Sequence, residues 1–284
     1  MAGVESRPLF ITRSPQDIIL VSNRKLRARQ MLGKYRIEKR LATGPRADVY
    51  QAYDTIHGVK AALKIANPDI IEDDFLDEFR HEARLSSKME HPNVLPVQNA
   101  SFIDGYFVIA MRLGVETLGD RMTRRMSTAR ALEFMTQAVA AVSHAHSKRI
   151  IHCDVKPENF ILFPDNQLRL TDFGFSKIAL RTVKASGSGT LGYLAPEQAL
   201  GRPMFQSDVF ALGLVFYQLF SGSLPEYPYK WPMPGCERIR GKLRRRTIAW
   251  LRKSLEFRPQ DRYRDAVAME KAFKDIRLKI TPRD

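Results

Sequence analysis

Residues 151–159 read Ile-His-Cys-Asp-Val-Lys-Pro-Glu-Asn, and residues 171–174 read Thr-Asp-Phe-Gly. These two segments concentrate two carboxylates, a lysine and a side-chain amide in one short part of the chain: Asp154, Asp172, Lys156 and Asn159. A salt-bridged aspartate in a loop is the plainer alternative for either carboxylate. A run of this composition and spacing rarely arises by chance, however, so the two segments are the reference for interpreting the rest of the chain.

A second group of residues lies upstream. Residues 41–50, Leu-Ala-Thr-Gly-Pro-Arg-Ala-Asp-Val-Tyr, have a single glycine in a turn between two strand-like runs. Lys64 follows Gly44 by 20 residues, and Glu82 follows Lys64 by 18 in a charged segment with helical periodicity. A turn glycine or a strand-end lysine alone is an ordinary surface feature. The information lies in the ordered set.

In this order the motifs resemble those of eukaryotic-type (Hanks-type) serine/threonine protein kinases, with most similarity to the bacterial members, from about residue 33 to about residue 276. The resemblance implies an α+β fold of two lobes, a β-rich N-lobe with one helix and an α-helical C-lobe. It also implies ATP in the cleft between them, Mg²⁺, and transfer of the γ-phosphate to a serine or threonine of a protein substrate.

The resemblance assigns a role to each motif residue. Asp154 would accept a hydrogen bond from the substrate hydroxyl, and Lys156 would lie beside the transferring phosphate. Lys64 would contact phosphates and pair with Glu82. Hard oxygen donors suit Mg²⁺, so the metal ligands would be Asn159 and Asp172.

Nucleotide contacts are implied for a larger set. Ala42 and Ala47 stand where the family's phosphate loop usually has glycine, and a Cβ restricts close backbone approach, so we expect weakened contact with ATP. In the strand that leads to the hinge, Ile109 would be the gatekeeper. The expected nucleotide-binding residues are Leu41, Ala42, Gly44, Ala47, Val49, Ala62, Lys64, Ala110, Arg112 and Ile161.

Other family positions have architectural or regulatory meaning. Glu197, in residues 189–197, would pair with Arg262, and Asp208 would steady the catalytic loop. Cys153 replaces an arginine that usually pairs with a phosphate on the activation segment, so we expect activity without phosphorylation there. Ser86 stands where an apolar residue is usual.

Periodicity and turn residues predict the elements. The expected strands are 35–41, 48–53, 59–65, 97–102 and 106–111, and the expected helices are 73–89, 129–148, 207–221, 243–255 and 265–278. Four prolines make 224–235 an ordered loop. The expected divisions are an extension at 1–33, a domain at 34–278 with lobes meeting near 112 and 113, and a tail at 279–284.

Composition narrows the setting. The chain has 284 residues, a net charge of +15 and two cysteines. Because there are only two cysteines, we expect no disulfide framework, and we expect a reducing, cytoplasmic location. No apolar run is long enough to span a bilayer, and no signal peptide is evident. Neither zinc spacing nor interleaved aromatics support a nucleic-acid module. Basic groups at 24–29, 121–125 and 238–246 would attract an acidic partner.

Two other functions remain open. A pseudokinase that binds nucleotide as a scaffold is suggested by the altered loop glycines and by Ser86. Pseudokinases usually lack at least one counterpart of the motif residues, all of which occur here. A small-molecule phosphotransferase of related fold is the other, but such enzymes generally lack a segment like 195–197 with its arginine partner.

Overall fold

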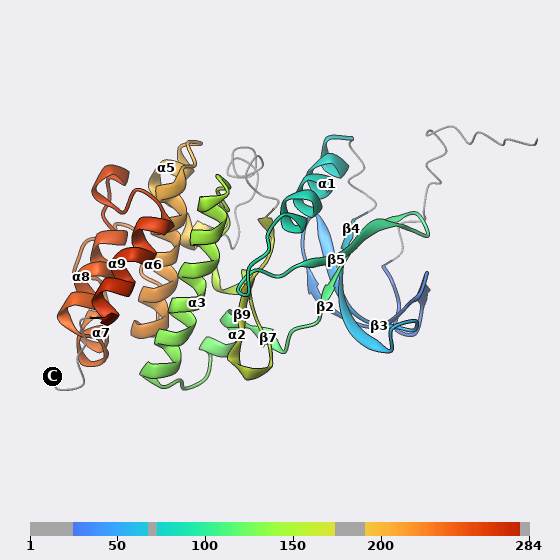
Figure 1. The fold of residues 1–284 in the computed structure, drawn as a ribbon, viewed down its shortest axis with the longest axis horizontal. Helices are drawn as coiled ribbons and strands as arrows, with labels where there is room; N and C mark the ends of the chain where they lie inside the picture. Colours follow the sequence, from blue (N-terminus) through green and yellow to red (C-terminus); the bar gives the residue numbers. More distant parts are fainter. Residues whose placement is uncertain (1–24, 68–72, 174–190, 279–284) are drawn as a thin grey trace, which may run out of the picture.

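The computed structural model describes residues 25–67, 73–173 and 191–278. Figure 1 shows two lobes side by side, one built on a twisted sheet with a helix across it and the other built from helices. This arrangement confirms the expected two-lobed α+β fold. No helix within the described ranges combines the length and apolar character needed to cross a membrane.

The first lobe contains a six-stranded antiparallel sheet in the order β1-β2-β3-β4-β6-β5. Side chains of β3 alternate between half-buried and buried along the whole strand, as a sheet between a core and a cleft requires. The strands are β1 (Met31–Leu32), β2 (Tyr35–Thr43), β3 (Ala47–Asp54), β4 (Val59–Ala66), β5 (Val97–Ile103) and β6 (Tyr106–Arg112).

The sheet has one strand more than expected, because β1 pairs with β2. Leu26 also belongs to the core of this lobe, in a cluster with Leu32, Tyr35 and Ile37. Packing against the sheet therefore begins at Leu26, before the expected domain start at residue 34. The basic residues around Leu26 hide this short packed segment in the sequence.

Strand pairing determines which side chains share a face of the sheet. Val49 lies opposite Lys64, and Lys64 lies opposite Ile109. Directly opposite residues point to the same side, and here that side carries α1 (Asp73–Ser87), whose Phe79 joins Ile109 in a buried cluster. The opposite face packs on a separate core that contains Ala110. The face toward α1 is the one that can line a cleft.

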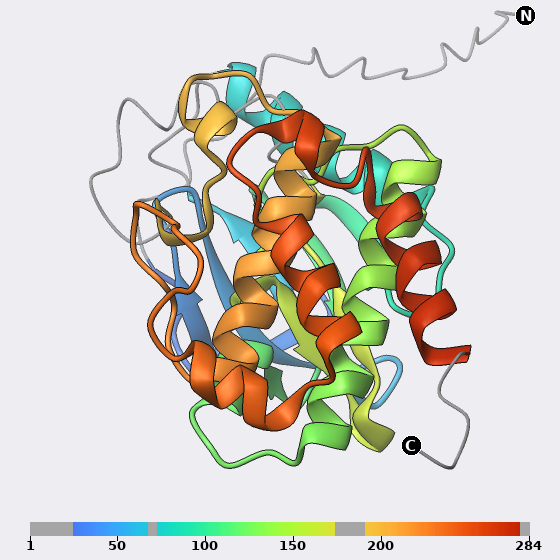
Figure 2. The ribbon, with the colours of Figure 1, turned by 90° about the vertical axis from the view of Figure 1, so that its left-hand side faces the viewer.

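The second lobe is organised around α3 (Thr128–Ser147) and α6 (Phe205–Ser221). Nearly every side chain of α6 is buried, which fits its apolar sequence and its central place in Figure 2. The other helices are α2 (Leu118–Met122), α5 (Pro196–Ala199), α7 (Cys236–Lys242), α8 (Arg245–Ser254) and α9 (Ala266–Leu278), with 3₁₀ turns at Pro157–Asn159, Pro164–Asn166, Leu191–Tyr193 and Pro259–Asp261.

A small sheet joins the lobes, with strands β7 (Glu116–Thr117), β8 (Phe160–Leu162) and β9 (Leu168–Leu170). The five expected helices are confirmed to within a few residues at each end, and residues 224–235 contain no helix, as expected. The short helices α2, α5 and α7 and the small sheet were not predicted. Elements of two to seven residues carry too little periodicity to be read from sequence.

Candidate active site

A buried lysine lies at the junction of the sheet and α1. Lys64 Nζ donates to both carboxylate oxygens of Glu82, at 2.7 and 2.9 Å, and to Asp172 Oδ1 at 2.8 Å. Lys64 and Glu82 are 8% and 7% exposed. Strand β4 supplies the lysine, α1 supplies Glu82, and the segment after β9 supplies Asp172. Three segments far apart in the sequence thus converge on one cation.

The pKa values of these groups reflect their burial and their mutual charges. Burial, together with the neighbouring charge of Asp172, raises the pKa of Glu82 to about 7 although Lys64 opposes this. Burial would lower the pKa of Lys64, but Asp172 and Glu82 outweigh it and raise the pKa. Burial would likewise raise the pKa of Asp172, yet Lys64 holds it below its usual value. Lys64 is therefore a cation and Asp172 an anion at neutral pH.

The second carboxylate, Asp154, lies in the loop between α3 and β8. Asn159 Nδ2 donates to the Asp154 backbone carbonyl at 2.8 Å and to its Oδ2 at 2.9 Å. Lys156 Nζ lies 2.8 Å from the same Oδ2. Asp154 is 9% exposed and Lys156 is half-buried. The side chain of Asp154 is thus fixed by two neighbours from its own loop.

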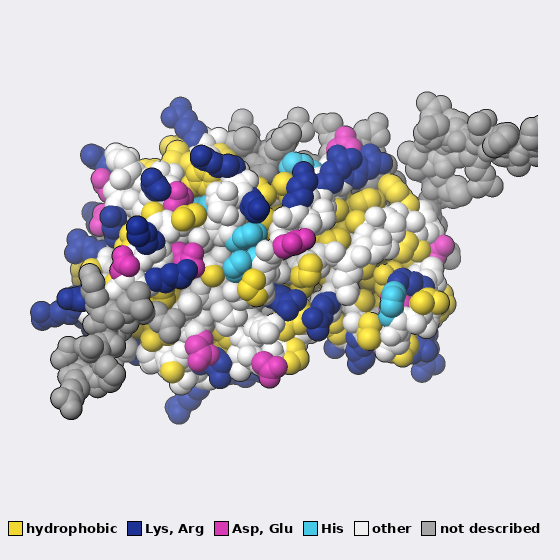
Figure 3. Space-filling model, viewed as in Figure 1, with side chains coloured by type: hydrophobic (Ala, Val, Ile, Leu, Met, Phe, Trp, Pro, Cys, Tyr) yellow, Lys and Arg dark blue, Asp and Glu magenta, His cyan; other side chains and the backbone are white. Residues whose placement is uncertain are grey.

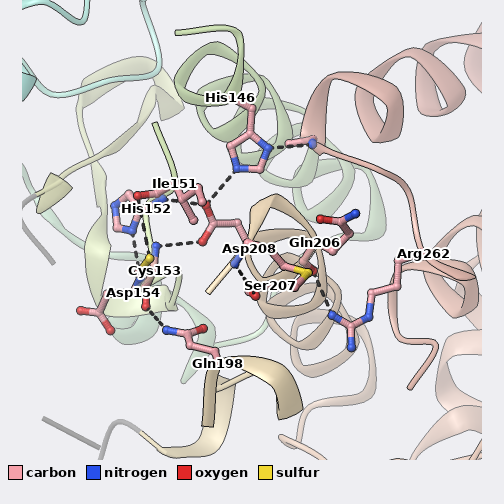
Figure 4. Close-up of polar contacts among 12 residues, drawn as sticks. His146, Ile151, His152, Cys153, Asp154, Gln198, Gln206, Ser207, Asp208 and Arg262 are labelled. Carbon is pink, nitrogen blue, oxygen red and sulfur yellow. Dashed lines mark hydrogen bonds and ion pairs between the residues drawn. The ribbon is translucent and has the colours of Figure 1, made fainter. Parts of the chain in front are cut away.

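The backbone of this loop is held from the second lobe (Figure 4). Asp208, on α6, accepts from the backbone N–H groups of His152 at 2.7 Å and Cys153 at 2.9 Å, and its Oδ2 lies 2.9 Å from His146 Nε2. His146 Nδ1 in turn accepts from the N–H of Ala266, so Nε2 carries the ring proton and donates. A buried carboxylate with three donors is fully satisfied and fixes the loop.

Cys153 occupies a special backbone position. Its φ is +65°, a left-handed conformation that non-glycine residues rarely adopt. Asp208 binds its N–H, and Gln198 Nε2 donates to its carbonyl at 2.6 Å. Burial, with the nearby charges of Asp208 and Asp154, raises the pKa of its thiol. The cysteine is therefore a neutral, buried residue, and its backbone is what the loop uses.

The two motif segments lie side by side. The N–H of Thr171 donates to the carbonyl of Asn159 at 2.9 Å, and His152 Nε2 lies 2.9 Å from the carbonyl of Thr171. The His152 ring also contacts Phe173 edge-on, at 4.9 Å between centroids. These contacts place Asp172 beside the Asp154 loop, while its bond to Lys64 connects it to β4 and Glu82.

Glu197 and Arg262 form a buried ion pair. Arg262 Nη1 lies 2.7 Å from Glu197 Oε1 and Nη2 lies 3.1 Å from Oε2. The guanidinium also donates to the carbonyls of Glu256, Phe257 and Gln206. All of the guanidinium donors have partners. The pair therefore holds α5 against the rest of the second lobe, and it joins the two residues that were expected to pair.

The hairpin between β2 and β3 adjoins Lys64, because Val49 of β3 lies opposite this lysine on the cleft face of the sheet. Its turn is closed by a bond from Gly44 N–H to the Ala47 carbonyl, 3.0 Å long, and Asn67 Nδ2 donates to the Gly44 carbonyl at 3.1 Å. Ala42 pairs with Val49 inside the hairpin, and Leu41 is 45% exposed. The expected apolar contacts Val49, Ala62 and Ile161 are half-buried.

Two expectations about the strand β6 need correction. Ala110 lies between β4 and β5, paired with Leu63 and Asn99, and its side chain packs in the core on the far face of the sheet. Its backbone is part of the ladder and cannot also reach a ligand. Ile109 is 1% exposed inside the cluster with Phe79. It does not border the open end of the cleft.

Met111 is the residue that sequence reasoning missed. It lies opposite Ala62, on the cleft face, and Thr171 Oγ1 donates to its sulfur at 3.8 Å. Strand β6 ends at Arg112, so the first backbone groups beyond the ladder belong to Leu113 and Gly114. A Cβ at Gly114 would lie 2.2 Å from Ile161 Cγ2, which explains glycine at this close approach. The position of Gly114 shortly after a buried strand is the signal in the sequence that could have identified this close approach.

Some expected residues lie outside the described ranges. Gly174 and residues 176–190 are among them, and the latter hold the hydroxyl residues of the activation segment that could be phosphorylated: Ser176, Thr182, Ser186, Ser188 and Thr190. The expectation that Cys153 makes activity independent of phosphorylation therefore stays a prediction. Ser86 lies within the described part and is buried, at 5% exposed.

Comparisons with known proteins agree with this geometry. A family model described as the protein kinase domain matches residues 35–259. The serine/threonine-protein kinase PrkC of Bacillus subtilis is 34% identical over 206 residues, covering 69% of this chain and 32% of PrkC. The serine/threonine-protein kinase PknA of Mycobacterium tuberculosis is 35% identical over 207 residues, covering 68% of this chain and 48% of PknA. The chain thus spans a third to a half of the length of these relatives.

Solved structures show the same fold. The kinase domain of Mycobacterium tuberculosis PknI superposes with a TM-score of 0.66 at 24% identity, covering 89% of this chain and 99% of that one. A structure titled PpkA-294 apo form gives a TM-score of 0.73 at 21% identity, covering 88% and 99%. At these identities the structural likeness concerns the fold alone.

Proposed function

Because this chain belongs to the protein kinase family, we propose that it is a serine/threonine protein kinase that transfers the γ-phosphate of ATP to a hydroxyl of a protein. The observation that carries the proposal is the convergence of Lys64, Glu82 and Asp172 beside Asp154. Phosphoryl transfer depends on positioning and on charge stabilisation, and this constellation supplies both. The similarity to the serine/threonine-protein kinases PrkC and PknA supports the same activity.

The transfer step can be assigned to residues of this chain. ATP would lie between the sheet and the Asp154 loop, with the Lys64 ammonium against its phosphates. Asp154 would accept a hydrogen bond from the substrate hydroxyl and orient its oxygen for attack on the γ-phosphorus. The bond from that phosphorus to the β,γ-bridging oxygen would break as the new P–O bond forms, ADP would leave, and the hydroxyl proton would pass to Asp154. Lys156 would neutralise charge on the transferring group.

Mg²⁺ fits two residues of this site. Asp172 is anionic, and Asn159 uses its nitrogen to bind Asp154, which leaves its amide oxygen for a metal. The bond from Thr171 to Asn159 supports their proximity. We propose that both bind Mg²⁺, which would neutralise phosphate charge when bound. The donor set is all oxygen, as this ion prefers.

The nucleotide pocket is proposed on the cleft face of the sheet. Val49 and Ala62 would lie above adenine and Ile161 below it, and Met111 would stand at the inner end. The backbone at the end of β6 and just beyond it, from Arg112 to Gly114, would meet the base edge, in place of Ala110. Ala42, Gly44 and Ala47 would cover the phosphates.

The wider assignments are proposals as well. We propose a kinase domain from about Leu26 to residue 278, with lobes meeting near Arg112, and a cytoplasmic location, which two buried free cysteines support. The complete polar constellation argues against a pseudokinase. The Glu197–Arg262 pair argues against a small-molecule phosphotransferase, since such enzymes generally lack it.

The test is a transfer assay with radiolabelled ATP and Mg²⁺, offering a generic protein, a generic serine- and threonine-containing peptide, and small hydroxyl compounds in parallel. Label on serine or threonine of the protein or the peptide is expected, and Lys64→Met should abolish it. ATP binding without any transfer would establish the pseudokinase instead. Label only on a small molecule would establish the phosphotransferase.

A further inference from the structure

A pocket of about 340 Å³ opens on the second lobe, between the loop after α6 and the residues after α8. Met233 and Leu255 line it and are buried, whereas Tyr229 and Trp231 form half-buried aromatic walls. Phe257 stands at its edge with 59% of its surface exposed. An exposed aromatic side chain beside an apolar hollow is typical of a binding site rather than of a closed core.

The walls of the pocket are held in place before anything binds. Tyr217, on α6, donates from its hydroxyl to the carbonyls of Met233 at 2.7 Å and Pro234 at 3.0 Å. Its ring also meets Trp231 edge-on at 5.8 Å. Four prolines restrict the loop further. A site that is already ordered loses little conformational entropy on binding.

Basic side chains surround the opening. Lys230 and Arg252 line the pocket and are exposed, and Lys253 and Arg258 are exposed next to lining residues. Among the described residues that line the pocket, Glu256 is the only acidic one, and its Oε1 lies 3.8 Å from Arg252 Nε. The edge therefore carries positive charge in excess. A ligand that combines an apolar side chain with carboxylates would match it.

The longest basic run of the sequence is a different feature. Arg238 donates to the carbonyl of Ser221 at 2.9 Å and Lys242 to that of Phe220 at 2.8 Å. Both cations thus cap the C-terminal end of α6, where a positive charge interacts favourably with the helix dipole. Figure 3 shows Lys and Arg side chains spread over the face in view, with Asp and Glu side chains scattered among them. The pocket is where positive charge meets an apolar hollow.

The pocket is connected to the segment that precedes α5. The hydroxyl of Tyr229 donates to the carbonyl of Gly192, 3.4 Å away, in the stretch that leads to Glu197. Figure 2 shows the loop after α6 beside this stretch. A chain that occupies the pocket would therefore run alongside residues 191–197, which resemble the substrate-facing end of the activation segment in the family. The location favours a protein substrate over other occupants.

We propose that this pocket docks the protein substrate by binding a segment in which one large apolar side chain is flanked by Asp or Glu. The apolar side chain inserts between Tyr229 and Trp231 against Phe257, and the flanking carboxylates meet Lys230 and Arg252. The proposal rests on the proposed kinase function. A second copy of this chain is a poor occupant, because its net charge of +15 repels a basic opening.

The probe is a fluorescein-labelled twelve-residue peptide with one Phe among Asp and Glu and without Ser, Thr or Tyr. Its binding to the full chain is measured by fluorescence anisotropy without ATP. Exchanging Phe for Ser in the peptide should weaken binding about tenfold, as loss of a buried aromatic anchor does. Phe257→Ser and Arg252→Glu in the protein should each weaken it about fivefold or more. The matched controls Ile56→Ser and Lys39→Glu change exposed residues of the first lobe and should leave it unchanged.

Equal binding of the Phe and Ser peptides, or unchanged binding to both pocket variants, would overturn the proposal. So would a single-stranded oligonucleotide that competes with the peptide and is itself weakened by the pocket variants, because the site would then recognise nucleic acid. Since the binding assay needs no ATP, a failure of phosphate transfer leaves its readout intact. Conversely, Phe257→Ser should phosphorylate a short serine peptide without the anchor at the normal rate, so a failure of docking leaves the kinase assignment standing.

Discussion

The Asp154 loop and the β2–β3 hairpin face the same cleft but are held very differently. In the loop, His152, Cys153 and Asp154 are buried, and Asp208 fixes two successive N–H groups. The hairpin is largely exposed, and its tip is held by backbone groups: the Gly44 N–H donates to Ala47, and the Gly44 and Arg46 carbonyls accept from Asn67. The difference teaches that the chain itself fixes the groups proposed to react, whereas in the proposed function ATP would order the cover over its phosphates.

The largest effect on phosphate transfer should come from Asp172, which lies beside the Asp154 loop and would bind the metal. Asp172→Ala removes a carboxylate that contacts Lys64 and would bind Mg²⁺, so phosphate transfer should fall by about a hundredfold or more. The far-ultraviolet circular dichroism spectrum should be unchanged, because little packing volume is lost. Turnover close to the normal rate, measured with radiolabelled ATP, would contradict the proposed role of Asp172 in phosphate transfer.

The support of the loop should appear as stability. Asp208→Ala strands three buried donors, the N–H groups of His152 and Cys153 and the ring of His146, and each costs about 1–3 kcal/mol when unpaired. The free energy of unfolding in urea should fall by about 3 kcal/mol or more. Asp77→Ala, which removes an exposed carboxylate of the first lobe, is the control and should change it by less than about 0.5 kcal/mol. Equal losses in the two variants would mean that the loop is not held as described.

The hairpin should respond in ligand binding. Replacing Ala42 and Ala47 together with glycine permits closer backbone approach to phosphates, so the KM for ATP should fall severalfold while kcat changes little. Each new glycine also raises the entropy of the unfolded chain, at a cost of about 0.5–1 kcal/mol. An unchanged or higher KM would show that the hairpin does not close over the nucleotide in this way.

The smallest effect is expected at the tip of the hairpin. Asn67→Ala removes the amide that donates to the Gly44 carbonyl, in a partly exposed position. Because water can replace this bond, the free energy of unfolding should change by about 1 kcal/mol or less. A loss as large as that of Asp208→Ala would erase the contrast between the two regions.

The spacing of the sequence motifs predicted most of the residues that meet in the candidate site. The contacts of Lys64 with Glu82, and of Asp154 with Lys156 and Asn159, join the residues that the spacing selected. Their roles stay proposals, and their convergence depends on tertiary packing, since Lys64 lies in β4, Glu82 in α1 and Asp154 in the loop after α3. The division into a β-rich and an α-helical lobe was predictable, because most strands and helices of the two lobes are long enough to show a hydrophobic period.

The remainder depended on tertiary pairing. Residues 106–111 are buried without a break, so no alternation reveals which of Ile109, Ala110 and Met111 faces the cleft. Strand pairing with β4 decides it. The pocket at Trp231 and Phe257 was equally hidden, since its walls come from segments that meet only through the packing of α6 and α8. Strand β1 is two residues long and cannot show a period at all.

The most direct test of the central claim is Asp154→Asn. The substitution keeps size and replaces a carboxylate by an amide, so ATP binding and the free energy of unfolding should stay near normal while single-turnover transfer to protein falls by at least about a hundredfold. Loss of transfer with ATP binding retained would support Asp154 as the residue that orients the substrate hydroxyl. Transfer at the normal rate would contradict the account.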